Sequence, residues 1–308
     1  MSVLSKKWLV ILNPTSGNGK SKRKWPEIKR LLEEHQFNYH LVVTEYPKHS
    51  ITLVHDYVDM GFRHIICVGG DGTLHNIING IMSQNKIPTH TIHVGMIPIG
   101  TGNDWVKTHK ISTNIHAAIK TILQGNVLCQ DIGKITFTTQ KSNPVYFNNL
   151  AGIGFDGYVV GKSNRFKNLG RFSYFLGALI GLLSYKNFSV DIFINSKVHY
   201  SGTTLMTIVG LCKYSGGGMI LTKDANAFDG LFDVSIAKNL SKLEIIKNLR
   251  YLFNGKITNH EKVLSLKTKA ISLEIHGKDF TFVQADGELL GQGNVKIHLI
   301  EKAFSFYA

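Results

Sequence analysis

The chain has little cysteine, few acidic residues and no long apolar run. Among its 308 residues there are only three cysteines, Cys67, Cys129 and Cys212, which are far apart and odd in number. That number excludes a disulfide framework and a metal site of the Cys-x-x-Cys type, and it suits a reducing cytoplasm. An apolar run near the N-terminus stops at Asn13, too early for the core of a signal peptide. The uncharged stretch 172–185 is too short to span a bilayer, so we expect no transmembrane segment.

The shortage of acidic residues leaves the chain strongly basic. Aspartate and glutamate total 21 against 35 lysines and arginines, which gives a formal net charge of +14. Such a charge favours an acidic partner, either a nucleic acid or an anionic membrane surface. The cations are spread along the chain, and the single dense cluster, residues 20–24, is explained by the solvated face of a helix. We therefore expect no nucleic acid and a membrane surface as the partner.

The first 130 residues alternate short apolar runs with helical patterns. The chain is 43% hydrophobic, as in a globular protein, and its length predicts two domains. The strands that we expect in the first domain are residues 8–12, 39–44, 64–68 and 93–98. Strands that alternate with helices form a parallel sheet with helices packed on its faces, so we predict an α/β domain over residues 1–130. Ligands of such sheets bind at the carboxyl ends of the strands.

Local signals predict where the helices of this domain begin and end. The apolar spacing that starts at Trp25 predicts a helix that Pro26 can help to start. Ser50 is the expected N-cap of the next helix, and Gly61 is expected to stop it. A third helix is expected over residues 74–82.

Beyond residue 130 the pattern changes to strands with few helices between them. The strands that we expect there are residues 190–194, 203–211, 232–237, 270–275 and 295–300. Helical patterns cover residues 170–185 and 241–253. We predict a β-rich second domain over residues 131–308, whose last strand, near 295–308, can return to the first domain.

Three loops of the first domain follow predicted strands and are rich in glycine, hydroxyl or amide groups. The middle one, residues 67–73 (CVGGDGT), places three glycines around one carboxylate, so its backbone can approach a phosphate closely. The others are residues 13–17 (NPTSG) and 98–104 (PIGTGND). Each alone is compatible with an ordinary tight turn. Together, at one edge of a parallel sheet, they favour a pocket for nucleotide phosphates.

Several motifs occur in the order in which a known family carries them. They are NPTSG at 13–17, GGDGTLHNIING at 69–80, PIGTGND at 98–104, NNLAGIGFD at 148–156, FDGLFDV at 228–234 and ADGE at 285–288. Through them the whole chain resembles the diacylglycerol kinase catalytic-domain family of soluble bacterial lipid kinases, which is similar also to sphingosine kinases. The resemblance implies a nucleotide-binding α/β domain of the NAD-kinase and diacylglycerol-kinase type, a C-terminal β-sandwich domain, and a cleft between them where ATP meets a lipid hydroxyl.

The resemblance also implies an activity and its cofactors. The expected reaction moves the γ-phosphoryl group of ATP to a lipid hydroxyl, with diacylglycerol as the acceptor and phosphatidic acid as the product. Mg²⁺ is the expected metal, because it offsets the charge of the phosphates. We accordingly expect a cytoplasmic protein that associates peripherally with an anionic membrane during turnover. The sequence leaves a homodimer and the choice of lipid head group open.

Particular residues of the first domain acquire roles from this resemblance. Those expected around ATP are Asn13, Pro14, Thr15, Ser16, Gly17, Thr44, Gly70, Asp71, Gly72, Thr73, Leu74, His75, Asn76, Thr101 and Asp104. Of these, Asp71 and Asp104 are similar to the carboxylates that organise Mg²⁺ and its waters, with Asp131 as a further candidate. Mg²⁺ prefers oxygen ligands and keeps several waters, which agrees with that role. Taken alone, Asp104 is also a plausible helix cap and Asp131 a turn residue.

An acidic motif of the second domain, Asp286-Gly287-Glu288, also acquires roles from the resemblance. Apolar residues on both sides of Asp286-Gly287-Glu288 predict the tip of a β-hairpin. By resemblance, Glu288 is the general base that takes the proton from the lipid hydroxyl, with Asp286 beside it. Two carboxylates one residue apart can raise the pKa of one of them toward neutral pH, which suits a base.

A second magnesium ion is implied by resemblance alone. Asp229 would hold this structural ion together with the main chains of Asn226 and Leu231. From the residues themselves, Asp229-Gly230 is a turn, and one carboxylate gives only weak support to a site for a hard cation.

Asn76 departs from the family pattern, in which a glutamate usually follows the GGDGTLH motif. An amide still forms hydrogen bonds to a nucleotide, but it removes a negative charge. One alternative is therefore a catalytically impaired regulator that binds nucleotide or membrane. The other is an enzyme like NAD kinase, which shares the GGDGT motif.

Overall fold

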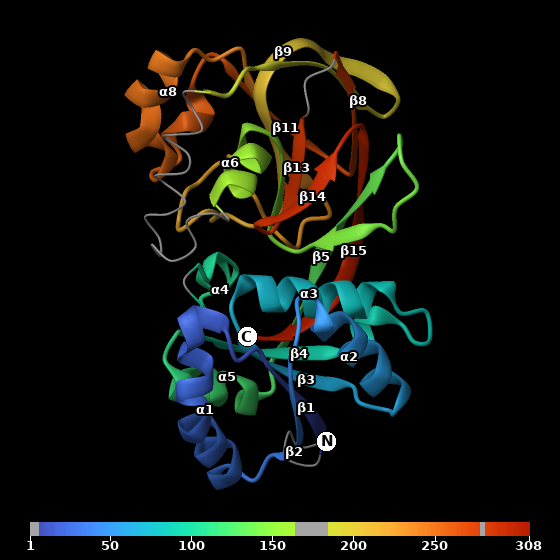
Figure 1. The fold of residues 1–308 in the computed structure, drawn as a ribbon, viewed down its shortest axis with the longest axis vertical. Helices are drawn as coiled ribbons and strands as arrows, with labels where there is room; N and C mark the ends of the chain where they lie inside the picture. The colour runs from blue at the N-terminus through green and yellow to red at the C-terminus, as the bar shows by residue number, and fades with distance from the viewer. Residues whose placement is uncertain (1–5, 101, 164–183, 278–280) are drawn as a thin grey trace. The chain divides into compact units, whose positions relative to one another are not determined.

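Figure 1 shows the computed structural model, which describes residues 6–100, 102–163, 184–277 and 281–308. The chain divides into two compact units. The first consists of Met1–Gln130 with Lys302–Ala308, and the second of Asp131–Glu301. The strands β5 (Val127–Phe137) and β15 (Val295–Tyr307) contribute residues to both units.

The first unit contains a parallel sheet in the order β15-β4-β3-β1-β2. Its other strands are β1 (Lys7–Leu12), β2 (Asn38–Val43), β3 (His64–Gly69) and β4 (His93–Pro98). Leu12 lies opposite both Val43 and Val68, and Gly69 lies opposite Pro98. The strands therefore end together, and the loops that follow them share one edge of the sheet, as the sequence predicts.

Helices cover this parallel sheet. They are α1 (Ser16–Glu34), α2 (His49–Asp59), α3 (Asp71–Ser83), α4 (Asp104–Thr108) and α5 (Ile115–Gln124), with a short 3₁₀ turn, η2 (Thr89–Thr91). Alternate residues of β1, such as Trp8 and Val10, pack with Ile28 of α1 and Ile119 of α5 in one buried cluster. Outside this cluster, α2 and α3 pack against each other (Figure 1).

The beginnings of two helices differ from the prediction. The range of α1 is interrupted at residues 17–19, which are left-handed, and Pro26 lies inside the regular helix that follows this kink and not at its start. Ser50 is buried within α2. The N-cap of this helix is Lys48, which has a φ of 66°. The Lys48 carbonyl already accepts the N–H of Ile51, so the helix starts before Ser50 can cap it.

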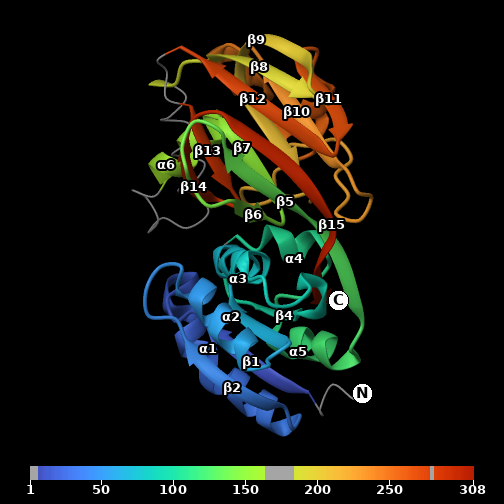
Figure 2. The same cartoon turned by 90° about the vertical axis from the view of Figure 1, so that its right-hand side faces the viewer.

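The second unit contains an antiparallel sheet in the order β14-β13-β7-β9-β8-β12-β15. Its strands are β6 (Val145–Phe147), β7 (Leu150–Gly154), β8 (Phe188–Ile194), β9 (Lys197–Gly210), β10 (Phe232–Lys238), β11 (Val263–Thr268), β12 (Ala270–His276), β13 (Phe282–Ala285) and β14 (Glu288–Gln292). Figure 2 shows the sheet curled, with β13 and β14 in a layer apart from β8 and β9. The architecture is a parallel α/β unit plus a β-sandwich-like unit, so the predicted fold class is confirmed.

In the described part of the second unit, few helices interrupt these strands. They are α6 (Phe155–Ser163), α8 (Lys242–Asn248), η4 (Leu249–Leu252) and η5 (Lys256–Asn259). The helical pattern predicted at 241–253 is thereby confirmed, whereas most of the pattern at 170–185 lies outside the described residues. Within the described ranges, no helix is long and apolar enough to cross a membrane.

Candidate active site

The three glycine-rich loops of the first unit pack directly on one another. A Cβ atom on Gly100 would lie 2.7 Å from the Cα atom of Gly70, and one on Gly17 would lie 3.2 Å from the carbonyl oxygen of Ile99. Contacts this short leave little or no room for a side chain, so a larger residue at Gly100 would push the second and third loops apart. The glycines thus permit a close backbone approach, and the three loops form a single surface.

Hydrogen bonds join the first loop to the second. The side-chain amide nitrogen (Nδ2) of Asn13 donates to the hydroxyl of Thr73 at 2.9 Å. The hydroxyl of Ser16 lies 3.3 Å from the same hydroxyl oxygen of Thr73. The side-chain oxygen of Asn13 accepts both the N–H and the hydroxyl of Thr15, at 3.1 and 2.9 Å. These bonds hold amide and hydroxyl groups at the carboxyl ends of β1 and β3, where a nucleotide phosphate would be bound.

Asp71 joins the second loop to the third. Its Oδ2 atom accepts the main-chain N–H of Asp104 at 2.8 Å. Asp71 is the first residue of α3, and Asp104 is the first residue of α4 and is buried. The two carboxylates predicted to organise Mg²⁺ therefore stand at the starts of two helices that a hydrogen bond links.

This pair of carboxylates fits a magnesium ion only in part. Carboxylate oxygens are suitable ligands, and Mg²⁺ commonly completes its shell with water and phosphate oxygens. Among the described residues, no three His, Cys, Asp or Glu side chains are grouped so that they could hold a metal ion by themselves. A magnesium ion here would thus depend on the nucleotide for further ligands.

Other residues predicted around ATP have different environments. The side chains of Leu74 and His75 are buried in α3, and the ring of His75 lies 3.3 Å from the amide nitrogen of Asn79. These two side chains therefore belong to the interior of the unit. Asn76 is partly exposed on the same helix.

Thr44 directly follows β2, and its N–H donates to the carbonyl of Leu12 at 2.9 Å. It consequently lies at the same edge of the sheet as the glycine-rich loops. Thr101 lies outside the described residues, so its placement stays a prediction.

Asp131 lies in the second unit and contacts the loop of residues 226–231. Its main-chain N–H donates to the carbonyl of Ala227, and its Oδ2 atom accepts the N–H of Gly230, both at 2.8 Å. The carboxylate is buried, with 1% of the residue exposed. These contacts give Asp131 a structural role in closing this loop.

The same loop was predicted to hold a structural magnesium ion. Asp229 forms an ion pair with Lys267 at 2.9 Å, and its other oxygen accepts the N–H of Leu231 at 3.1 Å. The hydrogen bond to Asp229 raises the pKa of Lys267, so the lysine is charged at neutral pH. The side-chain oxygen of Asn226 accepts the N–H of Phe228. Lys267 thus matches the charge of Asp229, and the metal site that Asp229 would form with the main chains of Asn226 and Leu231 stays a prediction.

The Asp286-Gly287 turn connects β13 to β14, which confirms the predicted hairpin. Both turn residues have positive φ, 50° and 82°, as a two-residue hairpin turn requires. The Asp286 carboxylate accepts three main-chain N–H groups, those of residues 148–150, at 2.9 to 3.1 Å. Glu288 is the first residue of β14 and is partly exposed. The two acids therefore differ in role, since Asp286 anchors the hairpin to the start of β7.

A buried polar pair behind this hairpin was missed by the sequence analysis. Gln284 and Asp156 are 2% and 5% exposed, and the Gln284 amide donates to the carboxylate of Asp156. The side-chain oxygen of Gln284 accepts the N–H of Gly287 at 2.9 Å. The only signal in the sequence is a glutamine within an apolar strand, since the partner is far away along the chain.

Comparison with known proteins places the chain in a family. Residues 7–135 match the family described as "Diacylglycerol kinase catalytic domain", and residues 149–307 match the "YegS C-terminal NAD kinase beta sandwich-like domain". The diacylglycerol kinase of Staphylococcus saprophyticus is 31% identical over 293 residues, which cover 94% of this chain and 91% of that relative. The diacylglycerol kinase of Staphylococcus aureus is 28% identical over 309 residues, covering 99% and 93%.

A solved structure shows the same fold. A crystal structure of a diacylglycerol kinase from Bacillus anthracis superposes with a TM-score of 0.72 at 22% identity, covering 98% of this chain and 96% of the other. The match to the diacylglycerol kinase catalytic domain and the curated relative of 31% identity identify the class of protein as a kinase phosphotransferase. The chain belongs to the diacylglycerol kinase family, and the predicted resemblance and enzyme class are confirmed.

Proposed function

We propose that the protein is an ATP-dependent kinase that phosphorylates the hydroxyl of diacylglycerol to give phosphatidic acid. The observation that carries this proposal is the joining of three glycine-rich loops at one edge of the first unit. Asn13 and Thr73 link the first loop to the second, and Asp71 and Asp104 link the second to the third. Membership of the lipid kinase family supports the acceptor class, and the curated relatives that we compared are named diacylglycerol kinases.

The domain of residues 1–130 is proposed to bind ATP. The second loop leads into the N-terminus of α3, and a helix N-terminus favours phosphate oxygens. Amide and hydroxyl groups of the first two loops then orient the phosphates, with Thr44, Asn76 and Thr101 as further contacts. Asp71 and Asp104 are the residues that would hold Mg²⁺, which neutralises phosphate charge when it is bound.

The second unit, Asp131–Glu301, is proposed to bind the lipid acceptor, since the last residues of the predicted domain 131–308 belong to the first unit. Glu288 takes the proton from the lipid hydroxyl, and Asp286 positions the hairpin that carries Glu288. A pocket of about 820 Å³ adjoins β14, and its walls include Phe282, Leu289 and Leu290. Apolar walls with a few polar groups suit an acyl chain attached to a polar glycerol.

A phosphorylation assay with labelled ATP tests this function. The acceptors are a panel of lipids in mixed micelles and, separately, NAD. We expect phosphate transfer to diacylglycerol, and Glu288→Gln should lower kcat about 10²- to 10⁴-fold because it removes the base. Glu274→Gln, at an exposed position of β12, is the matched control and should leave kcat unchanged. Phosphorylation of NAD alone would overturn the proposal in favour of an NAD-kinase-like enzyme.

Asn76 favours one other candidate function, an impaired kinase that acts as a nucleotide-binding or membrane-binding regulator. The variant Asn76→Glu distinguishes the two. If the natural chain binds ATP without phosphorylating any lipid, and Asn76→Glu gains turnover, the protein is an impaired kinase. Turnover by the natural chain itself would exclude this candidate.

A further inference from the structure

Helix α8 and the 3₁₀ turn that follows it expose large apolar side chains. Leu243 is 70% exposed, Ile246 46% and Phe253 50%. Leu243 and Ile246 are three residues apart, so they lie on the same face of the helix. A surface helix of a globular protein ordinarily turns its apolar face to the core and its polar face to solvent. Here the outer face is apolar, which marks an interaction surface.

The opposite side of this segment is packed into the second unit. Ile245 packs against the buried cluster that contains Leu205 and Leu240. Leu252, in η4, packs against a second cluster that includes Leu150 and Ile208. Because both ends of the segment are held by core contacts, the outward direction of Leu243 and Ile246 is fixed by packing.

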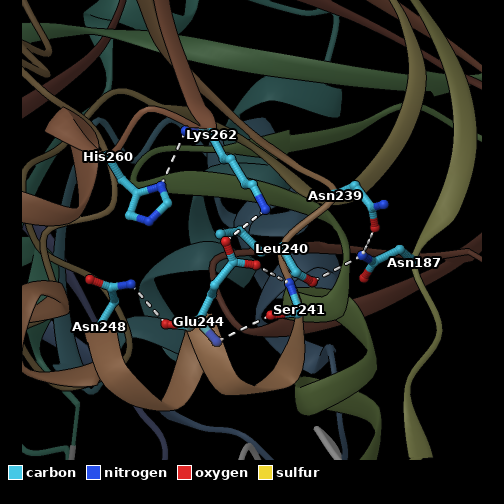
Figure 3. A network of polar contacts seen from close by, with 8 residues as sticks. All are labelled: Asn187, Asn239, Leu240, Ser241, Glu244, Asn248, His260 and Lys262. Atoms are coloured by element: carbon cyan, nitrogen blue, oxygen red, sulfur yellow. Dashed lines mark hydrogen bonds and ion pairs between the residues drawn. The ribbon is translucent and has the colours of Figure 1, made fainter.

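Figure 3 shows the polar network that holds the start of α8. Ser241 and Glu244 form a capping box, in which the N–H of each donates to the side chain of the other, at 2.8 and 3.3 Å. Glu244 also pairs with Lys262 at 2.6 Å, and the hydrogen bond from Lys262 is the main cause that lowers the pKa of Glu244 to about 2. Glu244 is the one acidic residue of the stretch 241–256. Its negative charge is matched by Lys262.

Cations surround the apolar face. Lys242, Lys247, Arg250 and Lys256 are all exposed. At about 100° per residue, Lys242 and Lys247 lie on either side of the Leu243 and Ile246 face. Lys242 and Lys186 also line a pocket of about 380 Å³ beside the start of α8. The segment therefore combines exposed apolar groups with exposed positive charge.

We propose that the outer face of residues 242–256 docks on the surface of an anionic phospholipid membrane. Apolar side chains of an interfacial helix enter the boundary of the acyl region, while lysine and arginine contact the lipid phosphates. The exposed positive charge of this face complements an anionic membrane, whereas an uncharged protein surface offers no such electrostatic attraction. The inference rests on the proposed function in one respect, since a diacylglycerol acceptor resides in a membrane.

Vesicle co-sedimentation of the full chain tests the docking surface. The vesicles are phosphatidylcholine alone and an equimolar mixture with phosphatidylglycerol. We expect binding to the mixture, reduced about tenfold by Leu243→Ser with Ile246→Ser and about twentyfold by Lys247→Glu with Arg250→Glu. Val198→Ser and Lys197→Glu alter similarly exposed residues of β9 and should change binding less than about twofold. Equal binding by all variants would overturn the proposal.

Kinase assays separate this inference from the proposed function. The variants should lose activity on diacylglycerol in anionic vesicles but keep it on a short-chain diacylglycerol dissolved as monomers. If the natural chain phosphorylates no lipid yet binds anionic vesicles through this face, the proposed function fails and the docking surface stands. If the variants change only the sedimentation coefficient of the protein, the face joins two copies of the chain and the membrane proposal is wrong.

Discussion

The carboxylate of Asp71 accepts the main-chain N–H of Asp104 at a distance of 2.8 Å. This bond connects the first turn of α3 to the first turn of α4, and thereby the second glycine-rich loop to the third. Hydrogen bonds to an ionised carboxylate are stronger than those between neutral groups. We infer that Asp71 has two roles, to align the loops and to supply negative charge for Mg²⁺.

Replacing Asp71 with asparagine separates these two roles. Asparagine keeps an oxygen that can accept the N–H of Asp104, so we expect the free energy of unfolding to change by less than about 1 kcal/mol. The lost charge should lower kcat at least about 10²-fold. Steady-state kinetics and urea unfolding measure the two effects. Asp59→Asn, at an exposed residue 3.6 Å from Lys86, is the control, and full activity of Asp71→Asn would refute the catalytic role.

Gly100→Ala should push the second and third loops apart. Its Cβ atom would lie 2.7 Å from the Cα atom of Gly70 and 2.6 Å from the side-chain oxygen of Asn103. The main chain at Gly70 cannot move aside without a substantial energetic cost. We therefore expect a loss of about 1–3 kcal/mol in the free energy of unfolding and weaker ATP binding. Thermal unfolding and ATP titration measure these changes.

Gly161→Ala provides the comparison for that variant. At this helical position of α6 the nearest atom, on Leu289, would be 3.6 Å away, so alanine fits and should be neutral or slightly stabilising. If Gly100→Ala were tolerated as well as Gly161→Ala, the close packing of the loops would not require a glycine at position 100.

The predictable part of the fold was the part encoded locally. The strands of the first unit are short apolar runs, and their shared carboxyl edge follows from the parallel arrangement alone. The hairpin at Asp286-Gly287 was also recognisable, because a two-residue turn has a strong sequence signature. By contrast, β7 (Leu150–Gly154) was missed, since all of its residues are buried and small or apolar, so the strand has no alternation of apolar and polar residues.

Contacts between distant parts of the chain could not be predicted. Asp286 bonds to the main chain of residues 148–150, more than 130 positions earlier in the sequence. Asp131 was considered for the magnesium site, yet its carboxylate closes the loop at Gly230. Neither partner can be inferred from neighbouring residues, because tertiary structure alone brings them together.

Asp286 and Glu288 should respond differently to removal of their carboxylates. Asp286→Ala leaves three main-chain N–H groups without their acceptor, so we expect a loss of about 1–3 kcal/mol in the free energy of unfolding. Glu288→Ala should cost less than about 1 kcal/mol while lowering kcat, because Glu288 is partly exposed at the start of β14. Urea unfolding and kinetics of both variants check this. Equal stability of the two variants would show that Asp286 does not anchor the hairpin.

His109 should make the protein less stable in mild acid. Burial lowers the pKa of its ring to about 4, against an ordinary value of 6.5, and the ring packs against Trp105 and Phe306 with centroids 4.6 and 4.7 Å away. Between these two pH values the unfolded chain binds a proton that the folded chain does not. The neutral ring therefore contributes stability that is fully present above about pH 6.5 and is lost as the pH falls toward about 4. Burial lowers the pKa of His64 to about 4 as well, which adds a loss in the same direction.

The variant His109→Phe isolates the contribution of this one ring. Phenylalanine keeps an aromatic ring between Trp105 and Phe306 but cannot bind a proton. In both proteins the free energy of unfolding should fall between pH 7 and pH 5. We expect this fall to be smaller in His109→Phe than in the natural chain, by about 1–2 kcal/mol. The hydrogen bond between His109 and Gln130 is lost at every pH, so the difference between the two pH values is the relevant quantity. His199→Phe, at an exposed position of β9, should keep the natural pH dependence, and the same dependence in His109→Phe would show that another group causes the acid sensitivity.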